Sequence, residues 1–179
     1  MFVNSKTAEE NAVLNAAFEL CAAARTAPKA CGVDILDTAV LTGEDKDAVA
    51  NKMRELAGEN GDSFFVRDAG NLDKSQALVL VGAKFTTRHL GHLCQLCGFD
   101  TCKTCEDKGA RCIYPALDLG IALGSAVSKV TDMRIDTRIM FTIGKAAAAL
   151  KLLGEYELIM GIPLSVSGKS PFFDRQQQK

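Results

Sequence analysis

The chain has 179 residues, 47% of them hydrophobic and 24% charged, with a formal net charge of −1. These values are typical of one globular domain with a substantial core, and they exclude a disordered chain. Because the sequence has no basic cluster, no apolar run of membrane-spanning length and no apolar leader at its start, we expect no nucleic-acid partner, no membrane association and a cytoplasmic location.

The N-terminal half alternates between helical and extended patterns. Apolar residues recur at helical spacing over residues 7–27, which begin with a capping box. Alternating apolar residues predict a strand over 33–41, and a second helical pattern follows over 42–58. A short apolar run at 64–66 leads into a turn and the start of a short helix. The continuous apolar run over 76–81 predicts a buried central strand.

The C-terminal half contains two strongly apolar helical segments, over residues 116–130 and 139–153. Gly120 and Gly124 lie on one face of the first segment, where they permit close approach of another helix or of a ligand, and close packing is the expected purpose. A last strand is predicted over 157–162, because the proline that follows should prevent its extension.

The order of these elements suits an α+β sandwich in which helices pack on a central mixed β-sheet. We expect a single α+β domain over residues 1–179, with a cysteine-rich metal or cluster loop at 89–113 within it. The tail over 165–175 carries two adjacent phenylalanines beside an acid and a base. This pattern predicts an arm that docks onto another surface, such as that of a partner subunit.

Five of the seven cysteines lie between Cys94 and Cys112, with the spacing C-x2-C-x4-C-x2-C-x6-C. Thiols crowded into a short, turn-rich segment usually share a soft metal ion or an iron–sulfur cluster. Five is an odd number, so these residues cannot form a complete set of disulfides among themselves. In a reducing compartment such thiols are expected to be ligands or redox groups.

The two cysteines outside this cluster and the two histidines of the chain are not expected to be ligands. Cys21 lies on the apolar stripe of the first helix, and Cys31 lies in the loop after that helix. We expect both to be structural. His89 and His92 lie just upstream of the cysteine cluster and are expected to be exposed loop residues rather than ligands.

The spacing favours a cluster over zinc. Cys94 with Cys97 and Cys102 with Cys105 form two C-x2-C knuckles, but only four residues separate them. Zinc sites usually separate their knuckles by about a dozen residues or more. A cluster is larger, and short, uneven spacings can wrap it, with the backbone amide of Gly98 and its neighbours available to the sulfur atoms. A structural zinc site and reactive or free thiols stay as alternatives.

Several segments resemble the DUF2148 family of prokaryotic proteins, which is described as containing a ferredoxin-type domain. The likeness is carried by residues 24–34, 93–102, 118–127 and 161–175 and by Cys112. It extends over nearly the whole chain. The resemblance implies a four-cysteine motif for an iron–sulfur cluster, with [4Fe–4S] favoured, formed by Cys94, Cys97, Cys102 and Cys112. The gap before Cys112 is shorter than the family leads us to expect, and Cys105 is an alternative ligand.

Three further segments are a helix end at 23–28, the Gly-Ile-Ala-Leu-Gly-Ser run at 120–125 and the Ile-Met-Gly-Ile-Pro strand at 159–163. Together they are similar to the FMN-dependent nitroreductase fold. This resemblance implies an α+β homodimer with FMN at the dimer interface and exchanged terminal arms. The arginine-rich opening that usually holds the FMN phosphate is absent near residues 1–6. The basic residues that could take its place are Arg25, Lys29, Arg67 and Arg138.

The first hypothesis is therefore a redox protein whose cluster passes electrons to or from a flavin or another electron-transfer partner. Such a protein would be a flavin and iron–sulfur oxidoreductase if it is an enzyme, and the sequence assigns no catalytic residue. The alternative is a non-enzymatic module whose cysteine loop holds structural zinc. No catalytic triad, phosphate-binding loop or dinucleotide motif is present.

Overall fold

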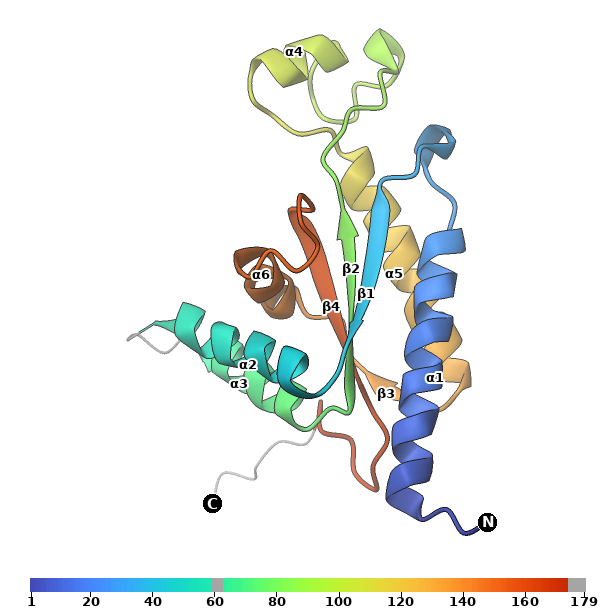
Figure 1. Cartoon of the computed structure of the whole chain (residues 1–179). Coiled ribbons are helices and arrows are strands. Elements are labelled where there is room, and N and C mark those ends of the chain that lie inside the picture. The colour runs from blue at the N-terminus through green and yellow to red at the C-terminus, as the bar shows by residue number, and fades with distance from the viewer. Residues whose placement is uncertain (59–62, 174–179) are drawn as a thin grey trace.

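A four-stranded antiparallel sheet forms the centre of the computed structural model, which describes residues 1–58 and 63–173. The strand order is β1-β2-β4-β3 (Figure 1). The strands are β1 (Leu36–Leu41), β2 (Ala77–Ala83), β3 (Asp136–Thr137) and β4 (Leu158–Ser165). The α+β class is confirmed, but every pairing is antiparallel where a mixed sheet was expected.

β2 is the central strand that the apolar run predicts. All seven of its residues are buried, because β1 and β4 pair with its two edges and helices cover its two faces. Val79, for example, faces Val40 on one side and Ile162 on the other. A strand covered on both faces reads as a continuous apolar run rather than an alternating one.

The helices α1 (Ser5–Thr26) and α5 (Tyr114–Asp132) lie side by side on one face of the sheet (Figure 1). Small residues allow their close approach, and the hydroxyl of Ser125 donates to the carbonyl oxygen of Ala23 at 2.9 Å. The buried alanines of this layer are Ala16, Ala17, Ala24, Ala122 and Ala126. The first core cluster thus joins α1, α5 and one face of the sheet.

The opposite face is covered by α2 (Gly43–Ala57), α3 (Ser63–Asp73) and α6 (Phe141–Ala149). The apolar run expected at 64–66 belongs to α3 itself, and α6 is shorter than the helix expected over 139–153. The second core cluster is centred on Val49, Met53, Leu72, Leu78, Leu80 and Ile143.

Two glycines let α6 contact β4 directly. A Cβ atom on Gly144 would lie 1.7 Å from the carbonyl oxygen of Ile159, and one on Gly161 would lie 2.1 Å from Cγ2 of Ile143. Both distances are far below van der Waals contact, so no side chain fits at either position. The helix therefore packs with its backbone almost against the strand.

Two expected boundaries are wrong. α1 begins before the predicted capping box, because the Asn4 side chain accepts the backbone N–H of Thr7 at 2.9 Å and so acts as the N-cap. β4 continues through Pro163 to Ser165. Gly161 exchanges backbone hydrogen bonds with Met140 on the edge away from β2. Residues two apart direct their N–H groups to the same edge, so the missing donor of Pro163 costs no bond to β2.

The C-terminal tail packs against its own chain. Phe172 is buried in the second core cluster, whereas Phe173 is 70% exposed. The acid and base of the predicted arm, Asp174 and Arg175, lie outside the described residues. The structure thus accounts for one of the two phenylalanines by packing within the chain.

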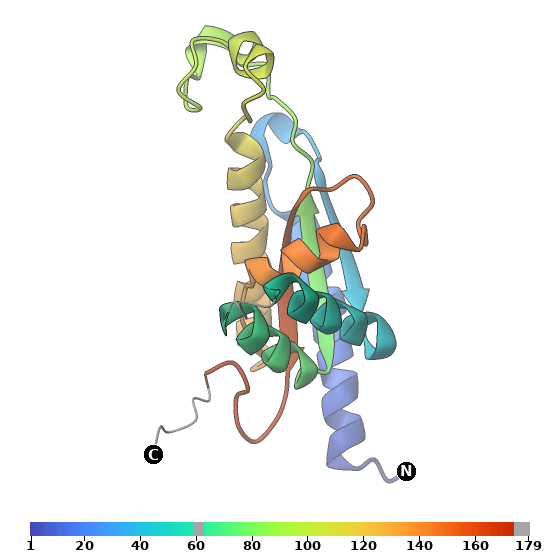
Figure 2. The same ribbon diagram turned by 90° about the vertical axis from the view of Figure 1, so that its left-hand side faces the viewer.

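The cysteine lobe, residues 84–113, connects β2 to α5 and projects beyond the end of the sandwich (Figures 1 and 2). It contains a short 3-10 turn at Gly91–Leu93 and the helix α4 (Cys102–Asp107). A second 3-10 turn, Ala30–Gly32, follows α1 near the base of the lobe. In the described part of the chain, no helix is long and apolar enough to cross a membrane.

Candidate metal centre

Tight turns shape the cysteine lobe. His89 and Gln95 have positive φ angles of 51° and 49°, which side chains other than glycine rarely adopt, and Gly98 has a φ of 82°. A backbone held in such conformations is common where a chain forms a binding site. The hydroxyl of Thr101 caps α4 by accepting the N–H of Thr104 at 3.1 Å. These turns fold the chain around one pocket.

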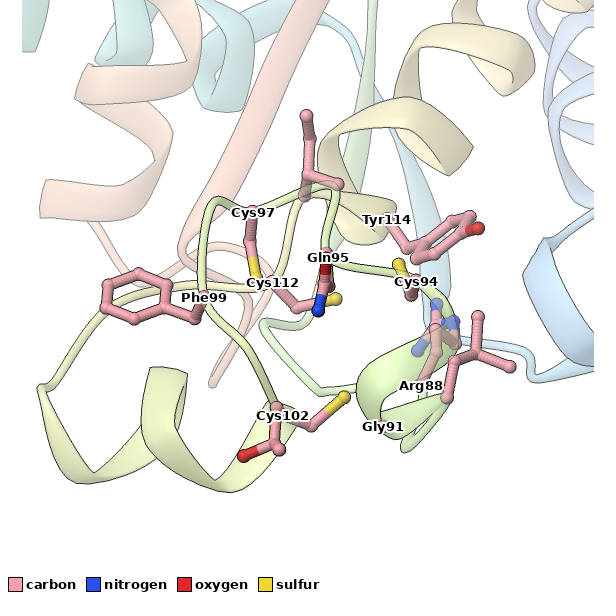
Figure 3. Close-up of a pocket in the computed structure, with 12 residues that line it drawn as sticks. Arg88, Gly91, Cys94, Gln95, Cys97, Phe99, Cys102, Cys112 and Tyr114 are labelled. Atoms are coloured by element: carbon pink, nitrogen blue, oxygen red, sulfur yellow. The ribbon is translucent and has the colours of Figure 1, made fainter.

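The pocket is lined by Cys94, Cys97, Cys102 and Cys112, the four cysteines of the predicted ligand set (Figure 3). They come from the turns before α4, from the first residue of α4 and from the segment before α5. All seven cysteines of the chain are free thiols. The lobe therefore places the four predicted ligands on the wall of one pocket, and no disulfide joins them.

Cys105 has a different environment. It is only 1% exposed and is absent from the residues that line the pocket. Burial raises the pKa of its thiol, and so do its hydrogen bond with Cys97 and the nearby thiols of Cys112 and Cys102. Only the thiolate form of cysteine ligates a metal. Cys105 is therefore buried outside the pocket lining, whereas Cys112 lines the pocket.

The thiols are not gathered around a single point. Within residues 1–58 and 63–173, no three His, Cys, Asp or Glu side chains lie close enough together to share one metal ion. His89 and His92 are exposed, as expected, and neither lines the pocket. Nε2 of His89 instead lies 3.1 Å from the hydroxyl oxygen of Thr87. This hydroxyl donates to Oε1 of Glu106 at 2.6 Å.

Tyr114 closes one side of the pocket at the start of α5 (Figure 3). Burial raises the pKa of its hydroxyl, and the neighbouring Cys94 adds to this through its charge and a hydrogen bond. Cys31 also lies close enough to raise this pKa. Cys31 is exposed, so core packing does not account for it, whereas Cys21 packs against the first core cluster as expected.

A buried ion pair forms the base of the lobe. Nη2 of Arg88 lies 2.7 Å from Oδ2 of Asp118, and the two side chains are 1% and 2% exposed. Nη1 of Arg88 donates to the hydroxyl of Thr86 at 2.7 Å, and Oδ1 of Asp118 accepts the backbone N–H of Ala30 at 2.9 Å. This network ties the lobe to α5 and to the turn after α1. Arg88 also lines the cysteine pocket.

The four basic residues considered for an FMN phosphate do not converge within one chain. Arg25 pairs with Asp34, and Lys29 donates to the carbonyl oxygen of Ala27 at 2.8 Å; both lie near the end of α1. The remaining two are Arg67 on α3, which pairs with buried Asp68 at 2.7 Å, and half-buried Arg138 between β3 and α6. α3 covers the opposite face of the sheet from α1.

A second, largely apolar pocket of about 270 Å³ lies between the turn after α1 and the outer side of α5. Lys29 lines it at one side, and Leu117 and Ile121 line it along the helix. Tyr114 lines both this pocket and the cysteine pocket. One aromatic side chain therefore separates the two.

Sequence reasoning did not identify Arg88, Asp118 and Tyr114 as parts of the site. Arg88 and Asp118 are 30 residues apart in the sequence, so no local spacing indicates that they pair. The position of Tyr114, two residues after Cys112, was the available signal. The ligand set stays a prediction that the family resemblance implies, because the spacing alone does not choose between Cys105 and Cys112.

Comparison with known proteins identifies two relationships by sequence. The model of the family described as "Uncharacterized protein containing a ferredoxin domain (DUF2148)" matches residues 108–175. This segment includes Cys112 but not the other three cysteines of the pocket wall. An uncharacterised protein of Archaeoglobus fulgidus is 44% identical over 187 residues, and the alignment covers 100% of both chains.

Solved structures show the fold. A BluB-like flavoprotein from Clostridium difficile 630 matches with a TM-score of 0.57 and 19% sequence identity. The match covers 100% of this chain and 87% of the flavoprotein chain. A nitroreductase with bound FMN from Desulfitobacterium hafniense matches with a TM-score of 0.58 and 16% sequence identity. The match covers 94% of this chain and 81% of the nitroreductase chain. The chain has a nitroreductase-like fold and belongs to the DUF2148 family of ferredoxin-domain-containing proteins.

Proposed function

We propose that the protein is a cytoplasmic redox protein that binds a [4Fe–4S] cluster through Cys94, Cys97, Cys102 and Cys112. The observation that carries the proposal is the shared pocket of these four free thiols, with the fifth cysteine buried behind it. The ferredoxin domain of the family supports the same role. A cytoplasmic location keeps such thiols reduced and available as ligands.

The cluster would supply one-electron transfer, and the chain supplies its ligands and surroundings. The four cysteines must lose their thiol protons to ligate, and the backbone amides of the turn around Gly98 are available to its sulfur atoms. The lobe projects beyond the sandwich (Figure 2), so a partner could approach the cluster without contacting the sheet. This placement suits exchange of electrons with a second protein or cofactor.

Zinc is the weaker candidate because of Cys105. A zinc site built from two C-x2-C knuckles would use Cys102 with Cys105. Cys105 is buried and does not line the pocket, whereas Cys112 does. The arrangement therefore favours the cluster ligand set over the two-knuckle set.

FMN is a second candidate cofactor, favoured by the apolar pocket next to Tyr114. Its wall offers Lys29 for a phosphate and the apolar side chains of α5 for a flat ring. The related nitroreductase structure contains bound FMN. In this arrangement Arg67 and Arg138 could contact the flavin only from the second subunit of a dimer.

We also propose that the protein is a homodimer built on the outer face of α5. Leu117 and Ile121 are 44% and 48% exposed there. Gly120 lies between these two residues and Gly124 lies beyond them. A Cβ atom on either glycine would meet no atom within 4 Å in residues 1–58 and 63–173. Packing within the chain therefore does not explain these glycines, and the second copy would supply the helix that they were expected to accommodate.

Metal and flavin analysis of protein purified without oxygen tests these proposals. We expect about four iron atoms and about four sulfide ions per chain, as a [4Fe–4S] cluster requires. One zinc ion per chain without sulfide would contradict the cluster proposal. Flavin released on denaturation supports the FMN site, and flavin-free protein that binds no added FMN rejects it.

A further inference from the structure

The guanidinium group of Arg88 has one nitrogen atom, Nε, that has no partner among the described residues. Its two terminal nitrogens donate to Thr86 and Asp118, each at 2.7 Å. The Nε atom is fully buried and has no hydrogen-bond partner among the described residues. Buried polar groups in proteins almost always have a partner, so an unpaired N–H calls for an explanation.

Arg88 is part of the wall of the cysteine pocket. The residue is only 6% exposed, and it lines the pocket together with the four predicted ligands. Figure 3 shows its guanidinium group on the same side of the pocket as Cys94. The buried Nε atom therefore belongs to a side chain that shares the pocket wall with Cys94.

Asp118 fixes the orientation of this group. Its Oδ2 atom binds Nη2 of Arg88, and its Oδ1 atom accepts the backbone N–H of Ala30 at 2.9 Å. Burying two charges is costly. Two apolar side chains of similar volume in place of a buried ion pair often stabilise a fold equally well or better. A structural role alone thus gives little reason for an ion pair at the base of the lobe.

We propose that Arg88 donates its Nε–H to a sulfur atom of the cluster or of a ligating cysteine, and thereby raises the reduction potential of the cluster. This inference rests on the proposed function. Hydrogen bonds to the sulfur atoms and nearby charge are among the factors that set cluster potentials. An added electron makes the sulfur atoms more negative, so a cationic donor stabilises the reduced form more than the oxidised form. Asp118 is the positioning residue for this donor.

The reduction potential of the loaded protein tests the proposal with the variant Arg88→Lys. Lysine keeps the positive charge and can still pair with Asp118, but it has no donor at the position of Nε. We expect normal iron and sulfide contents and a potential more negative than that of the wild type. Arg88→Met combined with Asp118→Asn removes the donor and both charges of the buried pair, and its potential should also be more negative than that of the wild type.

Lys103→Met is the matched control. Lys103 is adjacent in sequence to Cys102, but its side chain is 82% exposed and pairs with Asp107 at 3.0 Å in solvent. Water screens such a charge, so the potential should change little. A potential of Arg88→Lys equal to that of the wild type, or shifted no more than that of Lys103→Met, would overturn the inference.

A second measurement does not depend on a variant of Arg88. Arg111 is the other arginine of the lobe. The substitution Arg111→Lys leaves Arg88 as the one arginine in residues 84–113. When this protein is made with ¹⁵N-arginine and reduced, pulsed electron paramagnetic resonance should detect a coupling between the cluster and a ¹⁵N nucleus. A loaded protein without this coupling rejects the role of Arg88, whereas protein without iron and sulfide rejects the cluster itself.

Discussion

Individual thiols of the lobe differ in what surrounds them, and these surroundings decide which can act as ligands. Cys112 lines the pocket, whereas Cys105 is buried behind it with a raised pKa. Cys94 has the hydroxyl of Tyr114 as a neighbour. Sequence spacing identified these cysteines as a group, but it could not choose between Cys105 and Cys112, since both suit a short, uneven motif. Burial and pocket lining supply that choice.

We expect Cys112→Ala to lose the cluster and Cys105→Ala to keep it. Removal of one thiolate leaves one iron without its protein ligand, while the alanine at position 105 removes a side chain outside the pocket. Iron and sulfide per chain, measured after purification without oxygen, distinguish the two. Full cluster content in Cys112→Ala together with its loss in Cys105→Ala would reverse the assignment.

A second residue-scale prediction concerns acid stability. Hydrogen bonding by Arg25 lowers the pKa of Asp34, so the folded state favours the carboxylate. The stabilisation is present above the unfolded pKa of aspartate, about 3.9, and is lost as the pH falls through the lower folded value. Both side chains are partly exposed, so the contribution is no more than about 1 kcal/mol.

Denaturant unfolding of Asp34→Asn across pH tests this sign. The variant should be less stable than the wild type at pH 7, and the two curves should converge as the pH falls below about 4. A difference in stability that grows in acid would contradict the ion-pair explanation.

Among the elements, those with a strong and uniform pattern were predicted correctly. The continuous apolar run of β2 and the long apolar helix α5 are present where expected. The errors fall at boundaries that depend on contacts distant in sequence. β4 continues through Pro163, because the backbone N–H that proline lacks would point to the edge away from β2. The direction of each strand in the sheet depends on pairings that no local pattern reveals. Local periodicity thus predicts elements better than it predicts their pairing.

The contact between α6 and β4 gives an element-scale prediction. Gly144→Ala would place a methyl group 1.7 Å from the carbonyl oxygen of Ile159, so α6 must move away from the sheet. We expect a loss of about 3 kcal/mol in the free energy of unfolding, the upper end for an overpacked core. Thermal or denaturant unfolding measures this change.

Gly70→Ala is the matched control, since Gly70 lies in α3 and a Cβ atom there would contact nothing within 4 Å. Alanine is the better helix former by about 1 kcal/mol, so this variant should be as stable as the wild type or more stable. Equal effects of the two substitutions would show that α6 does not pack as closely as described.

For the whole molecule, the lobe and α5 place the two proposed cofactor sites on one connected surface. The cysteine pocket leads through Tyr114 to the apolar pocket on α5, and the exposed stripe with Gly120 and Gly124 continues along the same helix. A dimer built on α5 would therefore bring the proposed flavin site and cluster site of each chain close to the interface. The resemblance to the nitroreductase fold predicted this frame, but the buried contacts between lobe and helix required the structure.

Gly124→Glu tests the proposed dimer. A Cβ atom at this position would meet no atom within 4 Å among the described residues, so the monomer should fold with equal or greater stability. A buried like-charge pair across the two-fold axis should prevent association. Light scattering after size exclusion should show a dimer for the wild type and a monomer for this variant.

Leu56→Glu, on the exposed side of α2, is the corresponding control and should stay dimeric. A monomeric wild type at micromolar concentration, or a dimeric Gly124→Glu, would contradict an interface on α5.

An ultraviolet–visible spectrum shows directly whether the cysteine lobe holds an iron–sulfur cluster. The protein is purified without oxygen and measured before and after addition of dithionite. We predict a broad sulfur-to-iron absorption that bleaches on reduction and that is lost in Cys112→Ala. Colourless wild-type protein that carries one zinc ion per chain would contradict the account.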